Sequence, residues 1–164
     1  KNIMAIKGEK GMLYVYVGAA YKPVACLTSI GLSSSVSIIE SQTKCFPGVV
    51  KKTPGSFSAS ISAEGEYIDT TTAGGDTAKV SHDAMFLAQQ LKTLQEWKID
   101  TNLDDAASVK YYGTGYYTDL ELTAGSGDEI STFSITLDVD GAVLYTDPNA
   151  WTSVFNNVFS SEFA

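Results

Sequence analysis

Apolar and polar residues alternate along several segments of the chain, which is the pattern of β-strands that bury one face. Residues 56–69 are the clearest example in the first half of the chain, because small or apolar side chains at odd positions from 57 to 65 alternate with serine or glutamate at even positions from 56 to 64. Residues 12–17, 32–39, 109–124 and 129–145 are also predicted to be strands, with residues 125–128 joining the last two as a hairpin. The chain is therefore expected to be mainly β.

The period changes in residues 81–98, where apolar side chains recur three or four positions apart, as in an amphipathic helix. Ser81 is a suitable N-cap, and Asp83 complements the positive end of the helix dipole. This segment is the expected helix of the body. Its apolar stripe should pack on the sheet or on a neighbour.

A second short helix is expected near the C-terminus, where Asp147 caps and Pro148 suits the first turn. We therefore divide the chain into a β domain at residues 1–145 and a C-terminal amphipathic arm at residues 146–164. The arm should dock on its own core or on a neighbouring subunit, and its large aromatic surface favours the neighbour. The aromatic candidates for that inter-subunit contact are Trp151, Phe155, Phe159 and Phe163.

Residues 43–55 contain two Pro-Gly pairs and three lysines, and they are predicted to be a long loop or a hairpin that projects from the body. Long loops are uncommon in compact domains and often carry function. The residues of this segment that we single out are Lys44, Phe46, Lys51 and Lys52.

The last two predicted strands place four carboxylates on one face, at Asp119, Glu121, Asp138 and Asp140. Ordinary antiparallel pairing around residues 125–128 sets Asp119 opposite about Ser134, Glu121 opposite about Thr132 and Asp138 opposite about Gly115. In that register the four groups share a face without converging on one point. A calcium site needs six to eight oxygens around one ion, so no metal site is expected.

Catalytic patterns are also missing from the sequence. His82 is the single histidine, and no G-x-S-x-G segment accompanies it. Gly113-Thr114-Gly115 lies inside a predicted strand without a following helix, so it marks a bulge or a close approach rather than a phosphate loop. We expect a protein that is not an enzyme and needs no cofactor.

The net charge of −8 is distributed unevenly. Residues 1–60 hold seven lysines against two acids, and residues 61–164 hold four lysines against seventeen acids. The chain has no arginine, the residue best suited to bidentate phosphate and guanine contacts, which argues against a sequence-reading nucleic-acid protein. A head-to-tail assembly would use one basic and one acidic surface, although a solvated surface explains the asymmetry as well.

No apolar run is long enough to span a membrane, so membrane insertion is not expected, and the first residues lack the apolar core of a secretory signal. Cys26 and Cys45 fit no metal spacing. They are expected to be reduced thiols, with a disulfide as the minority interpretation.

The order of these segments resembles the major tail tube protein of long-tailed (siphovirus) phages, the lambda-like and lactococcal-phage-like major tail protein family. The resemblance covers about residues 7–145 and rests on VACLTSIGLSSSVSIIES, a long loop, GSFSASISAEGEYID, the helix, and YYGTGYYTDLELTAGSGDEISTFSITLDVDG. It implies a β-sandwich or open barrel flanked by one helix, with a long loop and terminal arms. It also implies a virion protein that is assembled in the host cytoplasm. Its copies are expected to form six-membered rings, and the rings to stack into a tube that conducts DNA.

Under this resemblance the partners are other copies of the chain, tail tip or baseplate and tail terminator proteins, and the tape measure protein and DNA in the lumen. The long loop at about residues 40–56, the N-terminal arm and the C-terminal arm would bridge subunits and rings. Lysines of the loop would meet acids on the next ring. Carboxylates on the inner wall would repel DNA phosphates, and Asp119, Glu121, Asp138, Asp140 and Glu64 are the candidates. The alternatives are the inner tube of a contractile tail or injection system, and a monomeric β-sandwich module that binds carbohydrate.

Overall fold

The computed structural model describes residues 8–42, 48–70, 73 and 75–146, and the outcomes below concern that part of the chain. It contains a short 3-10 helix, one α-helix and seven strands. In chain order these are η1 (Gly8–Lys10), β1 (Met12–Val17), β2 (Ala20–Pro23), β3 (Leu27–Ser41), β4 (Lys51–Glu66), α1 (His82–Gln90), β5 (Gln95–Asp100), β6 (Lys110–Thr123) and β7 (Thr132–Thr146). The chain is mainly β, as the alternating pattern predicted.

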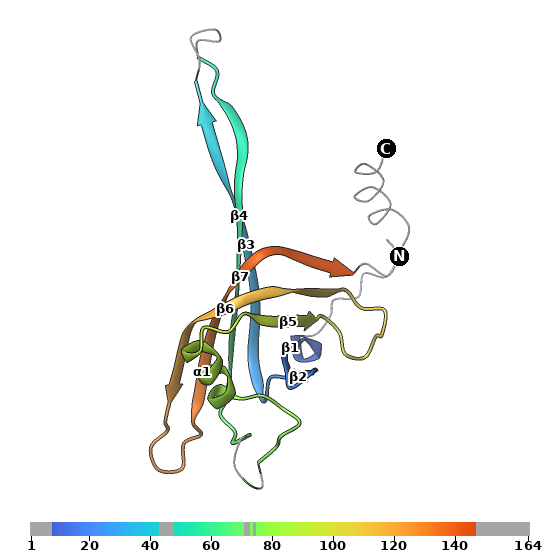
Figure 1. Cartoon of the computed structure of the whole chain (residues 1–164), viewed down its shortest axis with the longest axis vertical. Helices are drawn as coiled ribbons and strands as arrows, with labels where there is room; N and C mark the ends of the chain where they lie inside the picture. Colours follow the sequence, from blue (N-terminus) through green and yellow to red (C-terminus); the bar gives the residue numbers. More distant parts are fainter. Residues whose placement is uncertain (1–7, 43–47, 71–72, 74, 147–164) are drawn as a thin grey trace.

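The seven strands form one antiparallel sheet in the order β2-β1-β5-β6-β7-β4-β3. β1 lies close to β3 although four strands separate them in that order, because the sheet curls toward an open barrel (Figure 1). The inner face of the curl holds the hydrophobic core, and α1 lies against β6. The outer face is consequently left for polar side chains and for contacts with other molecules.

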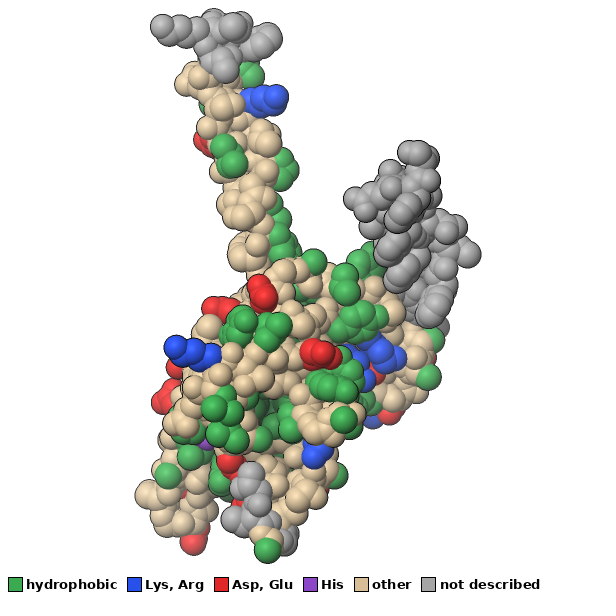
Figure 2. Space-filling model, viewed as in Figure 1, with side chains coloured by type: hydrophobic (Ala, Val, Ile, Leu, Met, Phe, Trp, Pro, Cys, Tyr) green, Lys and Arg blue, Asp and Glu red, His purple; other side chains and the backbone are tan. Residues whose placement is uncertain are grey.

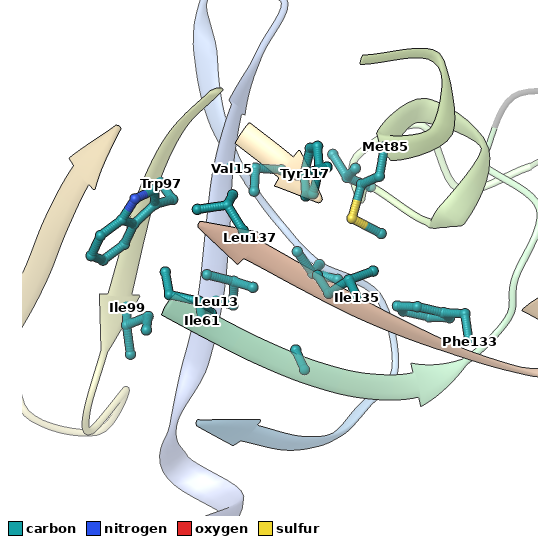
Figure 3. Packing of buried hydrophobic residues seen from close by; sticks show 13 residues of the cluster. Leu13, Val15, Ile61, Met85, Trp97, Ile99, Tyr117, Phe133, Ile135 and Leu137 are labelled. Atoms are coloured by element: carbon teal, nitrogen blue, oxygen red, sulfur yellow. The ribbon is translucent and has the colours of Figure 1, made fainter. Parts of the chain in front are cut away.

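Alternation along each strand supplies the core (Figure 3). Trp97 on β5 and Ile61 on β4 are fully buried, and Leu13, Leu137 and Met85 are each 1% exposed. Met85 is the α1 residue that enters this cluster. Burying such side chains contributes about 1.5–3 kcal/mol each, so this interior cluster is what holds the curled sheet together.

The predicted helix at residues 81–98 is too long. α1 ends at Gln90 with Leu91 as its C-cap, Lys92 takes a positive φ of 52°, and β5 begins at Gln95. Trp97 therefore lies on a strand between β1 and β6. The strand alternation of Gln95, Trp97 and Ile99 puts all three inward, and this burial overrides the helical spacing of the leucines.

The segment around residues 43–55 is a projecting hairpin rather than an open loop. β3 runs to Ser41 and β4 starts at Lys51, and the two strands extend well beyond the body (Figure 1). Pro54 lies within β4 and is paired with Ile38 on β3, beside a register shift that falls between Val36 and Ile38. Proline is tolerated there because β4 pairs with β7 only as far as Ser60, so this part of β4 has one free edge.

Several expectations fall outside the described residues, namely those on Lys44, Phe46, Trp151, Phe155, Phe159 and Phe163. Among the described residues, the single α-helix is nine residues long, and no helix has the length and apolar character needed to cross a bilayer. Of the two cysteines, Cys26 is described, and it is an exposed free thiol.

Candidate functional site

The outer face of β4, β7 and β6 carries all five carboxylates that the alternating pattern singled out. Directly paired residues on neighbouring strands share a face. Ser134 on β7 lies between Glu64 and Glu121, and Asp138 lies between Ser60 and Tyr116. The other two groups follow the same rule, with Asp119 opposite Thr136 and Asp140 opposite Thr114. We call this surface, bounded by residues 58–66, 114–121 and 132–140, the acidic face.

The register differs from the one expected around the β6–β7 turn. Asp119 lies opposite Thr136 instead of Ser134, Glu121 opposite Ser134 instead of Thr132, and Asp138 opposite Tyr116 instead of Gly115. The turn spans residues 124–131 instead of 125–128, and this moves the partners of Asp119 and Glu121 along β7. A β-bulge between Tyr117 and Asp119 adds one residue to β6 that has no partner on β7, which brings the partner of Asp138 back toward the expected one. The bulge keeps Tyr117 inward and Asp119 outward, so the acidic face remains continuous.

The acidic face has negative charge without opposing cations. Its three segments contain six carboxylates and no lysine. None of the five predicted carboxylates forms an ion pair with a described residue, and all five are exposed. No group of three or more described His, Cys, Asp or Glu residues is arranged to hold a metal ion. The surface is therefore suited to repelling a polyanion rather than to coordinating a cation.

Serine hydroxyls extend the acidic face along the projecting hairpin. Three cross-strand pairs join β3 to β4, with oxygen–oxygen distances of 2.9 Å for Ser33–Ser60, 2.8 Å for Ser35–Ser58 and 3.2 Å for Ser37–Ser56. At the foot of the hairpin, where β7 and β4 diverge, a hollow of about 380 Å³ is lined by the first two of these serine pairs and by Asp138. The paired hydroxyls use part of their hydrogen-bonding capacity on one another. The serine surface therefore has small, uncharged side chains that should interact only weakly with a passing molecule.

The opposite face of the same hairpin is apolar. Val36, Ile38 and Phe57 are 49%, 54% and 45% exposed, and they continue the face that is buried within the body. Toward the outer end of this face, Lys52 forms an ion pair with Glu40 at 3.0 Å. Exposed Lys51 pairs with Ser41 and lies on the opposite face, as does exposed Ile39. Near the body the hairpin therefore has one hydroxyl face and one apolar face. A basic side chain is visible toward its outer end (Figure 2).

The far wall of the open barrel carries a different surface, which the sequence patterns did not reveal. The Lys98 ammonium lies 4.3 Å from the centre of the Tyr14 ring and 5.2 Å from that of Tyr21. The Tyr16 and Tyr21 rings meet edge to face at 5.2 Å. Because the partners come from β1, β2 and β5, only the sheet order brings them together.

The tyrosines of β6 do not form the aromatic platform of a carbohydrate module. Tyr117 is buried in the core, while Tyr116 is exposed on the acidic face. Tyr111 packs against the core and is tilted by 41° to Tyr145. A sugar-binding surface needs neighbouring rings that are exposed and roughly coplanar, and these tyrosines point to different sides of the sheet.

His82 and the two glycines of β6 also have structural explanations. His82 stacks on Phe86, with ring centres 5.8 Å apart. Gly113 lies at a register shift, and a Cβ there would come within 3.0 Å of the Trp97 ring. A Cβ on Gly115 would collide with the Leu137 side chain and the Asp138 carbonyl. The predicted bulge and close approach at these glycines are confirmed.

Comparison with known proteins agrees with this geometry. The model of a family described as phage tail tube protein matches residues 5–145. The tail of an empty gene transfer agent particle, refined with C6 symmetry, has a TM-score of 0.68 at 17% identity, covering 87% of this chain and 99% of that one. The SPP1 tail tube has a TM-score of 0.65 at 17% identity, covering 87% and 80%.

A third similar structure comes from the six-fold symmetrised baseplate of the anti-feeding prophage, with a TM-score of 0.64 at 9% identity, covering 90% of this chain and 99% of that one. A search of curated proteins found no match. Identities this low establish a shared fold, while the match of the family model extends over most of the chain.

Proposed function

Because this chain belongs to the phage tail tube protein family, it is a structural, non-enzymatic component of the virion tail, and we propose that six copies form a ring and that rings stack into a hollow tube. The six-fold symmetry reported for the gene transfer agent tail supports the ring number. The two edges of the sheet, at β2 and β3, are available for pairing between neighbouring copies. Such pairing would join the sheets of a ring into one barrel.

The acidic face is the part of the chain that lines the lumen. The single observation that carries this assignment is the continuous surface of six carboxylates and paired serines without a lysine on β4, β6 and β7. The phosphates of passing DNA are repelled by such a wall, so the genome slides without binding. The lysine and tyrosines of the far wall, around Lys98, then face away from the DNA.

Contacts between rings involve the hairpin and the C-terminal arm. Lys51 and Lys52 lie toward the outer end of the hairpin, and Lys44 and Phe46 belong to the same segment of the sequence. A heterologous contact between this basic end and an acidic surface of the next ring would repeat along the tube. The aromatic residues of the arm at 146–164, Trp151, Phe155, Phe159 and Phe163, would cover apolar surface on a neighbouring subunit.

Further partners follow from the position of such a tube in a tail. Tail tip or baseplate proteins start it and a tail terminator protein ends it, while the tape measure protein and then DNA occupy the lumen. The resemblance to a baseplate structure of the anti-feeding prophage keeps the inner tube of a contractile machine as the second candidate. Sheath-like protein bound around purified tubes would favour that second candidate.

Reversing the charge of the proposed lumen tests this function. In phage that carry Asp138→Lys and Asp140→Lys, we expect tails to assemble and DNA ejection to slow strongly or stop, because the wall now attracts phosphates. Asp138→Asn with Asp140→Asn should give an intermediate rate. The control is Asp104→Lys with Asp105→Lys, which makes the same charge change on the exposed loop between β5 and β6 and in addition removes the Lys10–Asp104 ion pair of 2.8 Å.

The measurements are electron microscopy of tails and the rate of DNA release from triggered particles. We expect DNA release to be fastest in the control, slower in the asparagine variant and slowest in the lysine variant. Normal ejection by the Asp138→Lys, Asp140→Lys phage, with normal tails, would show that these residues do not face the DNA. For the Asp138→Lys, Asp140→Lys phage, DNA release that becomes slower as the salt concentration is lowered would support the electrostatic explanation.

A further inference from the structure

The outward side of α1 is unusually apolar for an exposed helix. The sequence predicted that this stripe would pack on the sheet or on a neighbour, and among the residues of α1 only Met85 is fully buried. Phe86 and Leu87 are 43% and 56% exposed, and the cap residue Leu91 is 68% exposed. Contiguous exposed apolar side chains of this kind mark an interaction surface.

A hollow of about 300 Å³ lies beside this surface, between the C-terminal end of α1 and β6. Ligand pockets start near ~300 Å³ and enclose most of their ligand, so a hollow of this size suits an inserted side chain better than a cofactor. The Tyr117 hydroxyl at its wall is buried and has no hydrogen-bond partner among the described residues. The residues that line the hollow are Ala88, Gln89, Lys92, Thr93, Tyr116 and Tyr117.

The same chain has an apolar surface that protrudes. Val36, Ile38 and Phe57 form the apolar face of the β3–β4 hairpin, with about half of each side chain exposed. The hairpin points along the long axis of the molecule and α1 lies toward the opposite end, so the hairpin cannot reach α1 of its own chain (Figure 1). Each copy thus has a protruding apolar surface at one end and a hollowed one toward the other.

We propose that the hollow between α1 and β6, with the exposed apolar side of α1, receives the apolar face of the β3–β4 hairpin from a second copy of this chain. The proposal rests on the self-assembly proposed above and identifies the acceptor for the hairpin. The contact is heterologous, since the donor and acceptor surfaces differ, so it repeats from copy to copy along the tube axis. It also keeps the serine face of the hairpin free to continue the lumen wall.

The charges near the two surfaces complement each other. The donor end carries Lys51 and Lys52, of which Lys52 is already paired with Glu40, and the turn between β6 and β7, at the same end of the molecule as α1, carries exposed Asp128 and Glu129 (Figure 1). A basic side chain is visible near the outer end of the hairpin with an acidic one below it, and the body shows side chains of both signs (Figure 2). Seating the hairpin along α1 brings opposite charges together, which orients the two copies.

Cross-linking tests the contact directly. The chain with Ile38→Cys and Thr93→Cys, in a background of Cys26→Ser and Cys45→Ser, places one thiol on the donor face and one at the rim of the acceptor hollow. We expect oxidation of assembled tubes to give a ladder of dimers, trimers and larger species, because each copy is a donor and an acceptor. The matched control replaces Ile38→Cys by Ser37→Cys, which lies next to it on the opposite face of the hairpin.

The outcomes separate this inference from the function on which it rests. Tubes with a ladder from Ile38→Cys and none from Ser37→Cys would support the contact. Tubes that give no ladder, or equal ladders from both variants, would overturn it while leaving the tube intact. Subunits with wild-type circular dichroism that form no tubes, even when tail tips are supplied as initiators, would overturn the proposed function and this contact together.

A second variant measures the strength of the contact without cysteine chemistry. Leu91→Asp should lower tube yield by about ten-fold or more, because an exposed leucine that is buried on assembly is replaced by a charge. Leu144→Asp is the control, since Leu144 is 59% exposed and lies on β7, outside both surfaces. Equal yields for Leu91→Asp and wild type would contradict the proposal.

Discussion

Phe57→Ala separates the stability of the subunit from the stability of the assembly. Phe57 is 45% exposed on the hairpin and lies opposite Val36. An aromatic side chain can bury about 150–250 Å², so about 70–110 Å² remains available for a neighbour. At about 25 cal/mol per Å², covering that area contributes roughly 2 kcal/mol to assembly.

A loss of about 2 kcal/mol corresponds to about a 30-fold rise in the critical concentration for tube formation. The fold of the subunit should lose much less, about 1 kcal/mol, because the substitution removes one cross-strand pair of an exposed hairpin. The critical concentration is measured by sedimentation of tubes seeded with tail tips, and the subunit stability by urea unfolding. Ser56→Ala, on the opposite face of the same strand, is the control.

The reasoning predicts a selective effect on assembly. If the critical concentration of Phe57→Ala equalled that of Ser56→Ala, the apolar face of the hairpin would not be covered in the tube. If urea unfolding changed as strongly as assembly, Phe57 would act through the subunit fold, and the assignment of its exposed area to a neighbour would be wrong.

Three further predictions concern the subunit itself. Gly115→Ala should destabilise it by about 1–3 kcal/mol in urea unfolding, because the added Cβ meets the Leu137 side chain and the Asp138 carbonyl, and an unchanged midpoint would contradict that close approach. Tyr117→Phe should leave stability unchanged or raise it by about 1 kcal/mol, since it removes a buried hydroxyl without a partner among the described residues, and a clear loss would reveal a hydrogen bond that the structure does not show. Burial raises the pKa of Tyr117 above the ordinary 10.0, so the contribution of this neutral side chain to stability is complete below pH 10 and declines as the pH rises further. The loss of stability at alkaline pH should therefore be smaller in Tyr117→Phe. Identical profiles of stability against pH would contradict the raised pKa of Tyr117.

The strands were predictable because their periodicity coincides with burial. Apolar and polar residues alternate over parts of residues 109–124 and 129–145, most clearly from Phe133 to Asp140, and the structure forms β6 and β7 there, with one face in the core. The same alternation placed the carboxylates of these strands on one face. The exact partners were not predictable, because the turn is longer than residues 125–128 and a bulge between Tyr117 and Asp119 shifts the register again, and neither leaves a signal in the hydrophobic pattern.

The helix shows where local pattern was insufficient. The leucines after Gln90 have helical spacing, but Trp97 is fully buried only when residues 95–100 form a strand between β1 and β6. That gain depends on strands distant in sequence. For the same reason the surface around Lys98 and the hollow beside α1 could not be foreseen, since several separate elements build each of them.

The central claim is that this chain forms a hollow tube whose lumen is lined by the acidic face. Electron cryomicroscopy of tubes, at a resolution that places the strands, tests it most directly. The account predicts stacked six-membered rings with Asp119, Asp138 and Asp140 on the inner wall and Lys98 on the far side of the barrel. A tube with the Lys98 surface toward the lumen, or an assembly without a lumen, would contradict it.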